Sequence, residues 1–447
     1  MKSMIKEIIW NFGTKHAALI KRVPLIRALA EGFYCRLKKK RTNEIFSPQY
    51  LERFRKSIGS LVPNRQQSGD PFGINIAGFI ETESGVGEAV RSNIRAINTL
   101  SLPFVLNNLK TGIRHNDRTF GSFSDDNRYQ INLIHVNADQ VPAFILDRGL
   151  GYFRRKYNVG FWVWELPEFP QKWQVLTHYF DEIWTPSTFC SKAISLHCDM
   201  PVITVPHSIS VDSIRQLNRA HFGLRDDCFI FLFMFDMLSI FERKNPLAVV
   251  ESFRSAFAVS DNAMLVIKFV NADSNSSAAA TIVDATQGLR AKIIDKCLDK
   301  DEVHALMSLC DCYVSLHRAE GFGFTLAECM YLSKPVIATA YSGNMDFMDK
   351  NNSFPVRYDI VELKEDYGPY KKGSTWAEPD SAHAAELMRF VYENREEAAA
   401  RGEVAARDIR DNLSPPAVGS IIKKRIEFIA REMKTKYSGS KQLAEVP

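Results

Sequence analysis

The stretch CDCYVSLHRAEGFGFTLAECMYLSKPVIATA, residues 310–340, decides the fold. An apolar run that ends at His317 is followed by a loop with two glycines, a helical pattern at 325–332 and a second apolar run at 334–340. Short apolar runs that alternate with helices are typical of buried parallel strands. The order strand, loop, helix and strand therefore predicts one βαβ unit of a parallel sheet.

The same alternation extends to both sides of this unit. Apolar runs that predict strands lie at 74–80, 104–108, 131–137, 159–165, 182–186 and 202–206, and again at 228–235 and 263–270. Helical patterns between them lie at 87–101, 142–150, 245–257 and 301–308. We therefore expect an α/β protein with two Rossmann-like, doubly wound parallel sheets in series. Because such sheets bind ligands at the carboxyl ends of their strands, the default site is a cleft between the two sheets.

The composition fits a folded protein of several domains. The 447 residues are 45% hydrophobic and 24% charged, and the purest apolar run, 228–235, is far shorter than the ~20 residues that span a bilayer. Eight scattered cysteines favour reduced thiols in a cytoplasmic protein over disulfides or a zinc site. We expect a basic helical extension at 1–70, sheet domains at 71–210 and 211–390, C-terminal helices at 391–436 and a tail at 437–447.

Positive charge is concentrated at the start of the chain. Residues 1–42 hold eleven Lys and Arg against two acids, a net charge of +9, whereas the rest holds 46 bases against 50 acids, a net charge of −4. A slightly acidic body argues against nucleic acid as a partner. Apolar residues recur at helical spacing in 1–42, which predicts either an amphipathic helix on an anionic membrane surface or a solvated extension packed on its own protein.

The loop 317–324 carries residues suited to binding a sugar phosphate. Gly321 and Gly323 allow a ligand to approach the backbone, and the helix that follows offers unpaired N–H groups to an anion. Glu320 lies at the mouth of this loop, where a carboxylate is suited to accept hydrogen bonds from sugar hydroxyls. Glu328 has a second interpretation, because Thr325-x-x-Glu328 is also the pattern of a capping box.

The pattern Glu320-x7-Glu328, followed by the sequence KPVIA at 334–338, resembles the retaining family-4 glycosyltransferases of GT-B fold, and the resemblance extends over about residues 73–430. It implies that Glu320 and the following loop face the donor sugar and diphosphate, and that Glu328 holds the ribose of the nucleotide. It also implies that 71–210 is the acceptor-side domain and 211–390 the donor domain. The loop residues implied in donor binding are Gly321, Phe322, Gly323 and Phe324.

A glycine loop in the first predicted sheet, Gly85-Val86-Gly87, is similar to the loop that lies near the donor phosphates in this family. The rival interpretation is a dinucleotide-binding fingerprint. That motif requires a third glycine, but position 90 is Val, and the next predicted strand ends in two asparagines instead of an acid for the ribose. Nicotinamide binding is therefore disfavoured.

The basic residues after the strand at 228–235 depart from the family pattern. Lys244 aligns with the lysine that neutralises the diphosphate, whereas acidic or apolar residues occupy the position of the family's arginine. Arg243 or Lys268 is a candidate for that role, and a solvated position at a helix start is the alternative for Arg243.

Four further residues at predicted strand ends are candidates. His135 occupies the region where many relatives carry an active-site histidine, and a buried structural histidine is the alternative. Trp164 and Glu165 combine an aromatic ring with a carboxylate, which suits a sugar or acceptor contact, and core packing of the tryptophan is the alternative. His317 either reaches the sugar or caps its strand.

The resemblance implies a retaining, metal-independent hexosyltransferase without a cofactor, and together with the basic residues 1–42 it predicts a cytoplasmic protein that is peripheral on the inner face of the membrane. It would move a sugar from a nucleotide-diphospho-sugar to a glycan or lipid-linked acceptor, in cell-surface polysaccharide biosynthesis. Glu320, His135 and Lys244 are the expected catalytic residues. The alternatives are a nucleotide-sugar 2-epimerase and a non-catalytic sugar-nucleotide-binding scaffold at the membrane.

Overall fold

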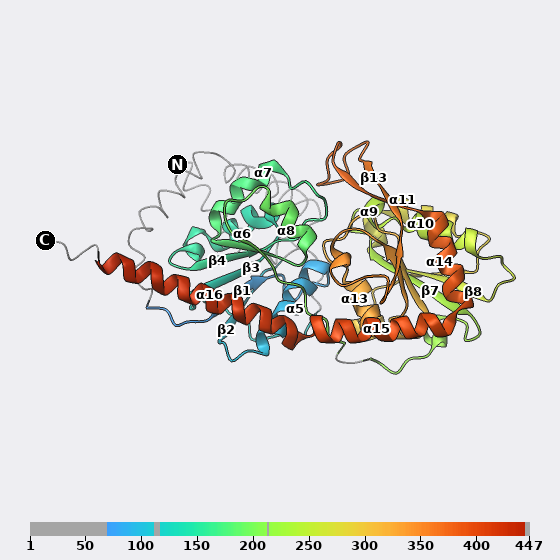
Figure 1. The fold of residues 1–447 in the computed structure, drawn as a ribbon, viewed down its shortest axis with the longest axis horizontal. Helices are drawn as coiled ribbons and strands as arrows, with labels where there is room; N and C mark the ends of the chain where they lie inside the picture. Colours follow the sequence, from blue (N-terminus) through green and yellow to red (C-terminus); the bar gives the residue numbers. More distant parts are fainter. Residues whose placement is uncertain (1–68, 111–116, 212–213, 443–447) are drawn as a thin grey trace, which may run out of the picture. The chain divides into compact units, whose positions relative to one another are not determined.

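The computed structural model describes residues 69–110, 117–211 and 214–442 (Figure 1). The predicted basic extension lies outside these residues except for positions 69 and 70, so its helices and its membrane contact stay predictions. The described residues fall into two units, one of 69–138 with 156–442 and one of 139–155. The domain boundaries predicted at 71, 211 and 391 also stay predictions.

The first sheet is parallel throughout, with the strand order β2-β1-β3-β4-β5-β6. Its strands are β1 (Ile74–Gly78), β2 (Phe104–Asn108), β3 (Ile131–His135), β4 (Tyr157–Phe161), β5 (Glu182–Thr185) and β6 (Val202–Thr204). All six strands of this sheet were predicted. The order reverses between β1 and β3, and ligands of open α/β sheets bind where such a reversal occurs.

The second sheet is also parallel, with the order β12-β11-β10-β7-β8-β9, which is the common order of dinucleotide-binding sheets read backwards. Its strands are β7 (Phe229–Asp236), β8 (Ala263–Val270), β9 (Ala291–Asp295), β10 (Cys312–Ser315), β11 (Val336–Thr339) and β12 (Phe354–Val356). Here the order reverses between β7 and β10. The two predicted doubly wound sheets are confirmed, although the sequence analysis missed β9 and β12.

Helices connect the strands, as parallel pairing requires. They are α5 (Gly85–Asn98), α7 (Gln171–Gln174) and α8 (Thr188–Ser195) in the first half, and α9 (Phe241–Lys244), α10 (Pro246–Ala256), α11 (Ser276–Ala285), α12 (Lys300–Leu309) and α13 (Phe324–Tyr331) in the second. An antiparallel hairpin of β13 (Tyr358–Glu362) and β14 (Thr375–Pro379), which the sequence analysis did not predict, forms a separate two-stranded sheet after β12.

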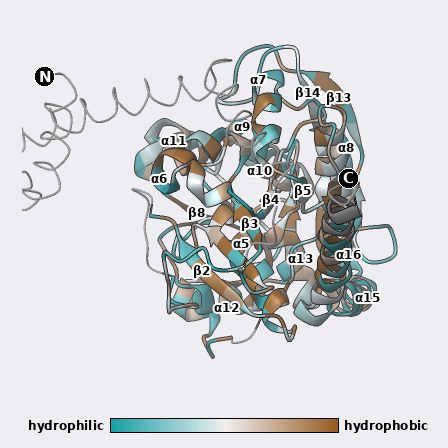
Figure 2. Cartoon of the chain, turned by 90° about the vertical axis from the view of Figure 1, so that its left-hand side faces the viewer, coloured by the Kyte–Doolittle hydropathy of each residue, from teal (hydrophilic) through white to brown (hydrophobic). Residues whose placement is uncertain are grey.

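The core of the second half lies on both faces of its sheet. Side chains alternate along β7, so Phe231 and Phe233 pack on one face while Ile230 and Leu232 pack on the other. Figure 2 shows hydrophobic residues gathered on the strands and on the helix faces turned toward them. The continuous apolar sequence at 228–235 is therefore explained by burial on both sides.

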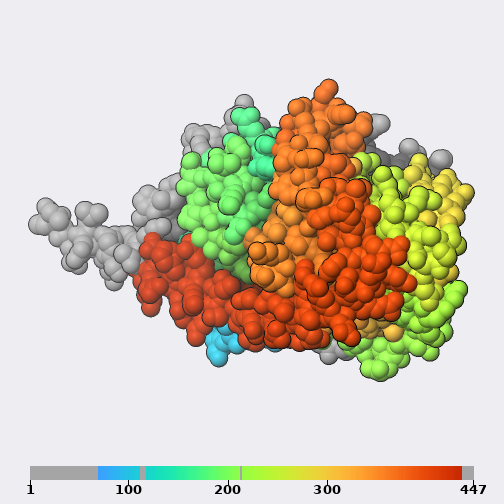
Figure 3. Space-filling model, turned by 45° about the vertical axis from the view of Figure 1, so that its right-hand side comes forward, coloured from blue at the N-terminus to red at the C-terminus, as the bar shows by residue number. Residues whose placement is uncertain are grey.

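The C-terminal helices are α14 (Ser381–Glu393), α15 (Arg395–Leu413) and α16 (Pro415–Gln442), and Ser414 separates the last two. Helix α15 packs against α13, and α16 packs against α5, so this segment contacts both halves (Figures 1 and 3). Arg425 fastens α16 to the first sheet, because its guanidinium binds both oxygens of the fully buried Glu182.

Residues 139–155 form a unit of their own. It contains α6 (Val141–Arg148), which ends at Gly149 with a φ of 74°, and a short 3-10 turn, η2 (Leu150–Phe153). The ring of Phe144 contacts the rings of Tyr152 and Phe153 edge to face. The helix predicted at 142–150 is confirmed.

Candidate active site

The second sheet presents Arg243, Lys244 and Glu320 at the point where its strand order reverses. Helix α9 follows β7 and carries the two bases, and the loop after β10 carries the carboxylate. The neighbouring turn holds this loop through its backbone, because Glu320 N–H donates to Ser342 Oγ at 2.8 Å and Gly343 N–H donates to Glu320 O at 2.9 Å. Hydrogen bonds therefore hold both the N–H group and the carbonyl group of Glu320 in place.

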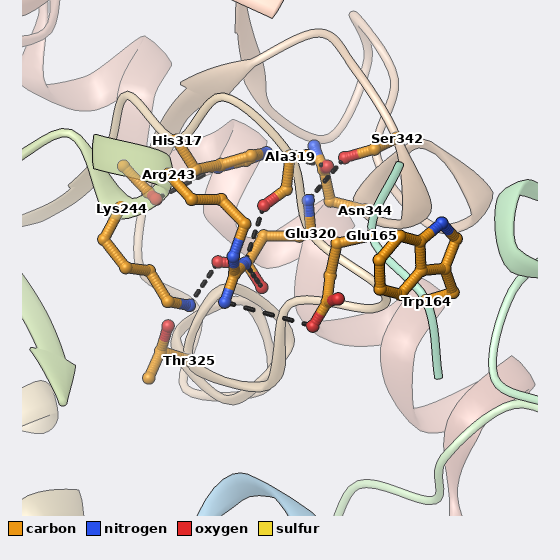
Figure 4. A network of polar contacts seen from close by, with 12 residues as sticks. Trp164, Glu165, Arg243, Lys244, His317, Ala319, Glu320, Thr325, Ser342 and Asn344 are labelled. Carbon is orange, nitrogen blue, oxygen red and sulfur yellow. Dashed lines mark hydrogen bonds and ion pairs between the residues drawn. The ribbon is translucent and has the colours of Figure 1, made fainter. Parts of the chain in front are cut away.

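Glu320 is the centre of an ion cluster (Figure 4). Lys244 Nζ pairs with one of its carboxylate oxygens, and Arg243 Nη1 lies 3.3 Å from the other. Arg243 Nη1 also donates to the carbonyl of Ala319 at 2.7 Å, and Arg243 Nη2 lies 4.0 Å from Glu165 Oε1 of the loop after β4. One buried guanidinium thus lies between a carboxylate from the first half and a carboxylate from the second.

Burial and charge act against each other in this cluster. Burial alone would raise the pKa of Glu320, but the charges of Lys244 and Arg243 outweigh it and lower the pKa to about 2. Burial lowers the pKa of Lys244, and Glu320 opposes that shift. Burial would also lower the pKa of Arg243, but Tyr370, Glu320 and Glu165 raise it. Glu320 is therefore ionised at neutral pH, and an incoming anion would compete with it for Lys244 and Arg243.

The loop beside Glu320 has almost no free space for side chains. A Cβ on Gly321 would overlap Val163 of the first half, and Gly323 has a φ of 100°. The Gly321 carbonyl accepts a hydrogen bond of 2.7 Å from Ser187 Oγ, which is also the N-cap of α8. Phe322 is buried, so a donor contact at this position would have to come from its main chain. Packing against Val163 therefore explains Gly321 and a positive φ explains Gly323, while the predicted approach of a ligand to this backbone stays a prediction.

Helix α13 begins earlier than the capping-box interpretation requires. Its N-cap is Gly323, which has no capping side chain, and Thr325 lies inside the helix, where its hydroxyl accepts a hydrogen bond of 2.8 Å from Tyr313. The Thr325–Glu328 capping box is therefore wrong. Glu328 instead lies with its Oε1 3.8 Å from Nε2 of His304 on α12. The ribose role of Glu328 stays a prediction.

The glycine loop of the first half begins a helix, as predicted. Ser84 caps α5 by accepting a hydrogen bond of 3.2 Å from the Gly87 N–H group, and a Cβ on Gly87 would overlap the carbonyl of Thr82. Glu88 of the first turn pairs with Arg95, and at 3.0 Å with Lys300 of α12 in the second half. Among the described residues, neither Gly85 nor Val86 forms a hydrogen bond with Glu320.

Lys268 lies apart from the Glu320 cluster, on the far side of β7 in the strand order. It is buried, and burial lowers its pKa while Cys297, Asp236, Asp295 and Glu83 oppose the shift. Glu83 belongs to the glycine-loop segment, and its carboxylate accepts a hydrogen bond of 3.8 Å from the Cys297 thiol. Lys268 therefore lies near Glu83 of the glycine-loop segment, whereas Arg243 lies next to Glu320. This favours Arg243 over Lys268 as the cation beside Lys244.

His135, His207 and His317 are buried with uncharged rings. His317 donates from Nε2 to Asn344 Oδ1 at 3.0 Å and receives Ser315 Oγ at Nδ1, which suits a role in holding the loop next to Glu320. His135 stacks on Phe161 at 4.5 Å between ring centroids, and its Nδ1 has no hydrogen-bond partner among the described residues. Burial lowers the pKa of all three rings, and that of His207 to about 3.

From the sequence, His207 is a weaker candidate in the join between the two predicted sheets, with a hinge residue as the alternative. Its ring stacks on Phe161 at 5.2 Å and on Phe324 at 4.6 Å, so an aromatic column runs from His135 at the end of β3 to the first residue of α13. The sequence offers only a histidine after Val-Pro at 205–206 as a signal. No described contact joins His135 to Glu320 or Lys244, so its catalytic role stays a prediction.

Trp164 and Glu165 lie in the loop after β4, which ends four residues before the predicted strand does. Trp164 is 4% exposed, and its indole N–H donates to the carbonyl of Glu168 at 2.8 Å. Phe169, Trp173 and Tyr370 cover its ring. This favours the packing interpretation of Trp164. Glu165 is partly exposed, and its predicted contact with a sugar or an acceptor stays a prediction.

The described part of the chain contains no group of three or more His, Cys, Asp and Glu side chains placed to hold a metal ion. No helix within 69–110, 117–211 and 214–442 is both long and apolar enough to cross a membrane.

Comparison with known proteins places these residues in a family context. Residues 239–408, which include Arg243, Lys244, Glu320 and Glu328, match the family model described as glycosyl transferases group 1. No curated protein matches the sequence.

Several solved structures share the fold. The sucrose-phosphate synthase of Thermosynechococcus elongatus has a TM-score of 0.60 at 12% identity, with 81% of this chain and 100% of that chain covered. A glycosyltransferase of Rickettsia africae has a TM-score of 0.59 at 12% identity, covering 81% and 99%. HepE of Anabaena, solved with UDP and glucose, has a TM-score of 0.56 at 14% identity, covering 80% and 100%. These likenesses confirm the GT-B arrangement of two Rossmann-like domains. Residues 239–408 are thus similar in sequence to group 1 glycosyl transferases, and the solved structures extend the likeness to the fold of the chain.

Proposed function

We propose that the protein is a retaining glycosyltransferase that moves a hexosyl group from a nucleotide-diphospho-sugar to a hydroxyl of a glycan or lipid-linked acceptor. The observation that carries the proposal is the pairing of Glu320 with Lys244 and Arg243 where the strand order of the second sheet reverses. These residues lie inside the segment that matches the group 1 family model. The reversal point of an open α/β sheet is where nucleotides bind.

The ion cluster suits a diphosphate that arrives with a sugar. The diphosphate would draw Lys244 and Arg243 toward its own charge, and the carboxylate of Glu320 would then accept hydrogen bonds from the sugar hydroxyls. In the transfer, the bond between the anomeric carbon and the β-phosphate oxygen breaks, and the bond to the acceptor oxygen forms on the same face. The acceptor proton passes to the leaving phosphate. Lys244 and Arg243 stabilise the charge that grows on that phosphate, which is electrostatic catalysis by preorganised groups.

Glu328 supplies the second part of donor recognition. It lies on α13, four residues after the first residue of that helix. Because α13 begins without a capping side chain, capping does not account for a glutamate at this position. A carboxylate at this place suits the two hydroxyls of a ribose. We also propose that the reaction needs no metal, that the protein acts at the cytoplasmic face of a membrane, and that its product belongs to a cell-surface polysaccharide. The net charge of +9 in residues 1–42 supports the membrane contact.

Binding of nucleoside diphosphates tests this proposal without knowledge of the acceptor. We expect at least one of UDP, GDP and ADP to raise the melting temperature of the wild-type protein, because a ligand of the native state stabilises it by mass action. Lys244→Met should weaken calorimetric binding of that nucleotide at least tenfold, whereas Lys350→Met, at an exposed lysine, should not. Absence of binding of all three to the wild-type protein would contradict the proposal.

A nucleotide-sugar 2-epimerase would also bind such a ligand. Incubation of the protein with UDP-glucose, GDP-mannose and ADP-glucose in the absence of acceptor separates the two functions. Conversion of a donor to its 2-epimer would favour the epimerase, and release of nucleoside diphosphate that rises with added acceptor would favour the transferase.

A further inference from the structure

The β13–β14 hairpin contacts other segments through β14 and through the loop that joins its two strands. A connection of twelve residues, 363–374, joins the two strands, which is longer than the two to five residues usual in hairpin loops. Ile360 on β13 is 54% exposed, whereas Tyr370 in the loop is only 4% exposed. Tyr367 and Tyr370 exchange two backbone hydrogen bonds of 2.9 and 3.0 Å, so the tip has a defined turn. The ordered loop therefore makes buried contacts of its own, in addition to those of β14.

The hairpin is fastened to the loop that carries Glu320. The guanidinium of Arg318 binds both carboxylate oxygens of Glu378 on β14, at 2.7 and 2.9 Å, and lies 5.3 Å from the ring centre of Trp376. Ala377 N–H donates to the carbonyl of Arg318 at 3.0 Å. Because Arg318 lies only two residues before Glu320, the hairpin and the candidate site are held in one arrangement.

The tip of the hairpin reaches the carboxylate of the first half. The Tyr370 hydroxyl donates to Glu165 Oε2 at 3.0 Å, and its ring lies 5.4 Å from that of Trp164. The other oxygen of Glu165 faces Arg243 Nη2 at 4.0 Å, and Thr375 Oγ1 donates to Glu168 at 3.4 Å. Burial raises the pKa of Tyr370 well above its usual range, so the phenol keeps its proton. Glu165 is thus oriented from both sides.

Glu165 keeps the capacity to bind a further donor. Its side chain is 21% exposed, and a carboxylate accepts about four hydrogen bonds. It belongs to the first half, whereas the family match and Glu320 belong to the second, and Arg243 lies between the two carboxylates. A partly exposed carboxylate on the half opposite the donor motif is suited to receive the hydroxyl of a second substrate.

We propose that Glu165 binds the reacting sugar hydroxyl of the acceptor, and that Tyr370 is a positioning residue that holds Glu165 for this contact. The hairpin of residues 358–379 then decides how well an acceptor competes with water for the donor sugar. This inference rests on the glycosyl transfer proposed above and adds the acceptor subsite to it.

The test compares transfer with hydrolysis in single and double variants. Tyr370→Phe removes one hydroxyl and leaves the ring against Trp164. Tyr367→Phe is the matched control, because its hydroxyl bonds to Glu365 of the same loop. Each protein receives UDP-, GDP- or ADP-glucose in water or in 1 M glycerol as the probe acceptor. The rates of hydrolysis and of glucosyl-glycerol formation give a transfer-to-hydrolysis ratio.

We expect Tyr370→Phe to lower this ratio about tenfold, since a hydrogen bond to a charged group is lost, with hydrolysis and nucleotide affinity changed less than twofold. Tyr367→Phe should leave the ratio unchanged. Adding Tyr370→Phe to Glu165→Gln should lower the ratio no further, because the tyrosine acts through the glutamate. An equal ratio in wild type and Tyr370→Phe, or a multiplicative loss in the double variant, would overturn the inference. A wild-type protein that neither binds nucleoside diphosphates nor consumes any donor would instead overturn the proposed function.

Discussion

Replacing Glu320 by Gln tests whether the ion cluster has the energy that its geometry implies. The pKa of Glu320 is lowered from 4.5 to about 2, and each pKa unit corresponds to ~1.4 kcal/mol, so the folded environment, in which the cations outweigh burial, favours the charged form by roughly 3 kcal/mol. Glu320→Gln leaves Lys244 and Arg243 buried without that countercharge. Loss of one partner of a buried pair costs about 3–5 kcal/mol. We therefore expect Glu320→Gln to lower the free energy of unfolding by about 3 kcal/mol at pH 7.

The effect should be smaller when both charges are removed. Lys244→Met leaves Glu320 with Arg243 at 3.3 Å, so we expect a loss of about 2 kcal/mol. The double variant has no lysine left without a countercharge. Its loss of unfolding free energy should therefore be about 2 kcal/mol smaller than the sum of the losses in the two single variants. Urea unfolding followed by tryptophan fluorescence measures each free energy. Arg225 and Asp227, an exposed pair, supply the control cycle and should show no measurable coupling.

The pH dependence has a definite sign. Because the pKa of Glu320 is lower in the folded than in the unfolded chain, its contribution is complete above about pH 4.5 and declines as the pH falls toward 2. The coupling with Lys244 should therefore be constant from pH 7 to 5 and smaller by roughly 1 kcal/mol at pH 3.5. Additive losses within ~0.5 kcal/mol, or a coupling unchanged at pH 3.5, would refute the interpretation of this cluster.

Three further predictions concern separate features. Glu328→Gln should weaken nucleoside diphosphate binding about 10–150-fold in calorimetry with an unchanged melting temperature, since it no longer has a cap to lose, and the reverse pattern would restore a structural role. Gly321→Ala should lower the free energy of unfolding by about 1–3 kcal/mol through overlap with Val163, and Val163→Ala in the same chain should recover part of it. His207→Phe keeps a stacked ring but removes a group whose pKa is about 3 in the folded protein and 6.5 in the unfolded chain. The free energy of unfolding of the wild type should therefore fall as the pH drops from 6 to 5, and that of the variant should fall less, by about 1 kcal/mol per pH unit. Parallel profiles would show that His207 does not titrate as its burial implies.

Strands that are apolar on both faces were readily predicted from the sequence, whereas mixed ones were not. The run at 228–235 is recognisable because every position of β7 up to Phe235 is buried. In contrast, β9 is AKIID, with a lysine and an acid at an edge of the sheet, and β12 has three residues with a proline at its centre. The hairpin strands YDIVE and TWAEP alternate polar and apolar residues over only five positions. Neither length nor period distinguishes these segments from loops.

The residues of the candidate site were predicted where a local motif carries them. Glu320, Lys244 and the loop glycines follow strand ends, and Arg243 follows as the neighbour of Lys244. The capping-box interpretation failed because Gly323, with its positive φ, starts α13 two residues earlier than the side-chain pattern suggests. Tyr370 and His207 gave no usable signal, since their contacts join residues 205 and 117 positions apart in the chain. Such contacts depend on packing between distant segments.

Release of nucleoside diphosphate from UDP-, GDP- and ADP-sugars tests the central claim most directly, namely that Glu320 and Lys244 form a glycosyl-transfer site. The wild-type protein should release nucleoside diphosphate from one of these donors, with the glycosyl group transferred with retained anomeric configuration. Glu320→Gln and Lys244→Met should each lower that rate at least 100-fold in protein that remains folded. Release at the wild-type rate by both folded variants would contradict the assignment of this site.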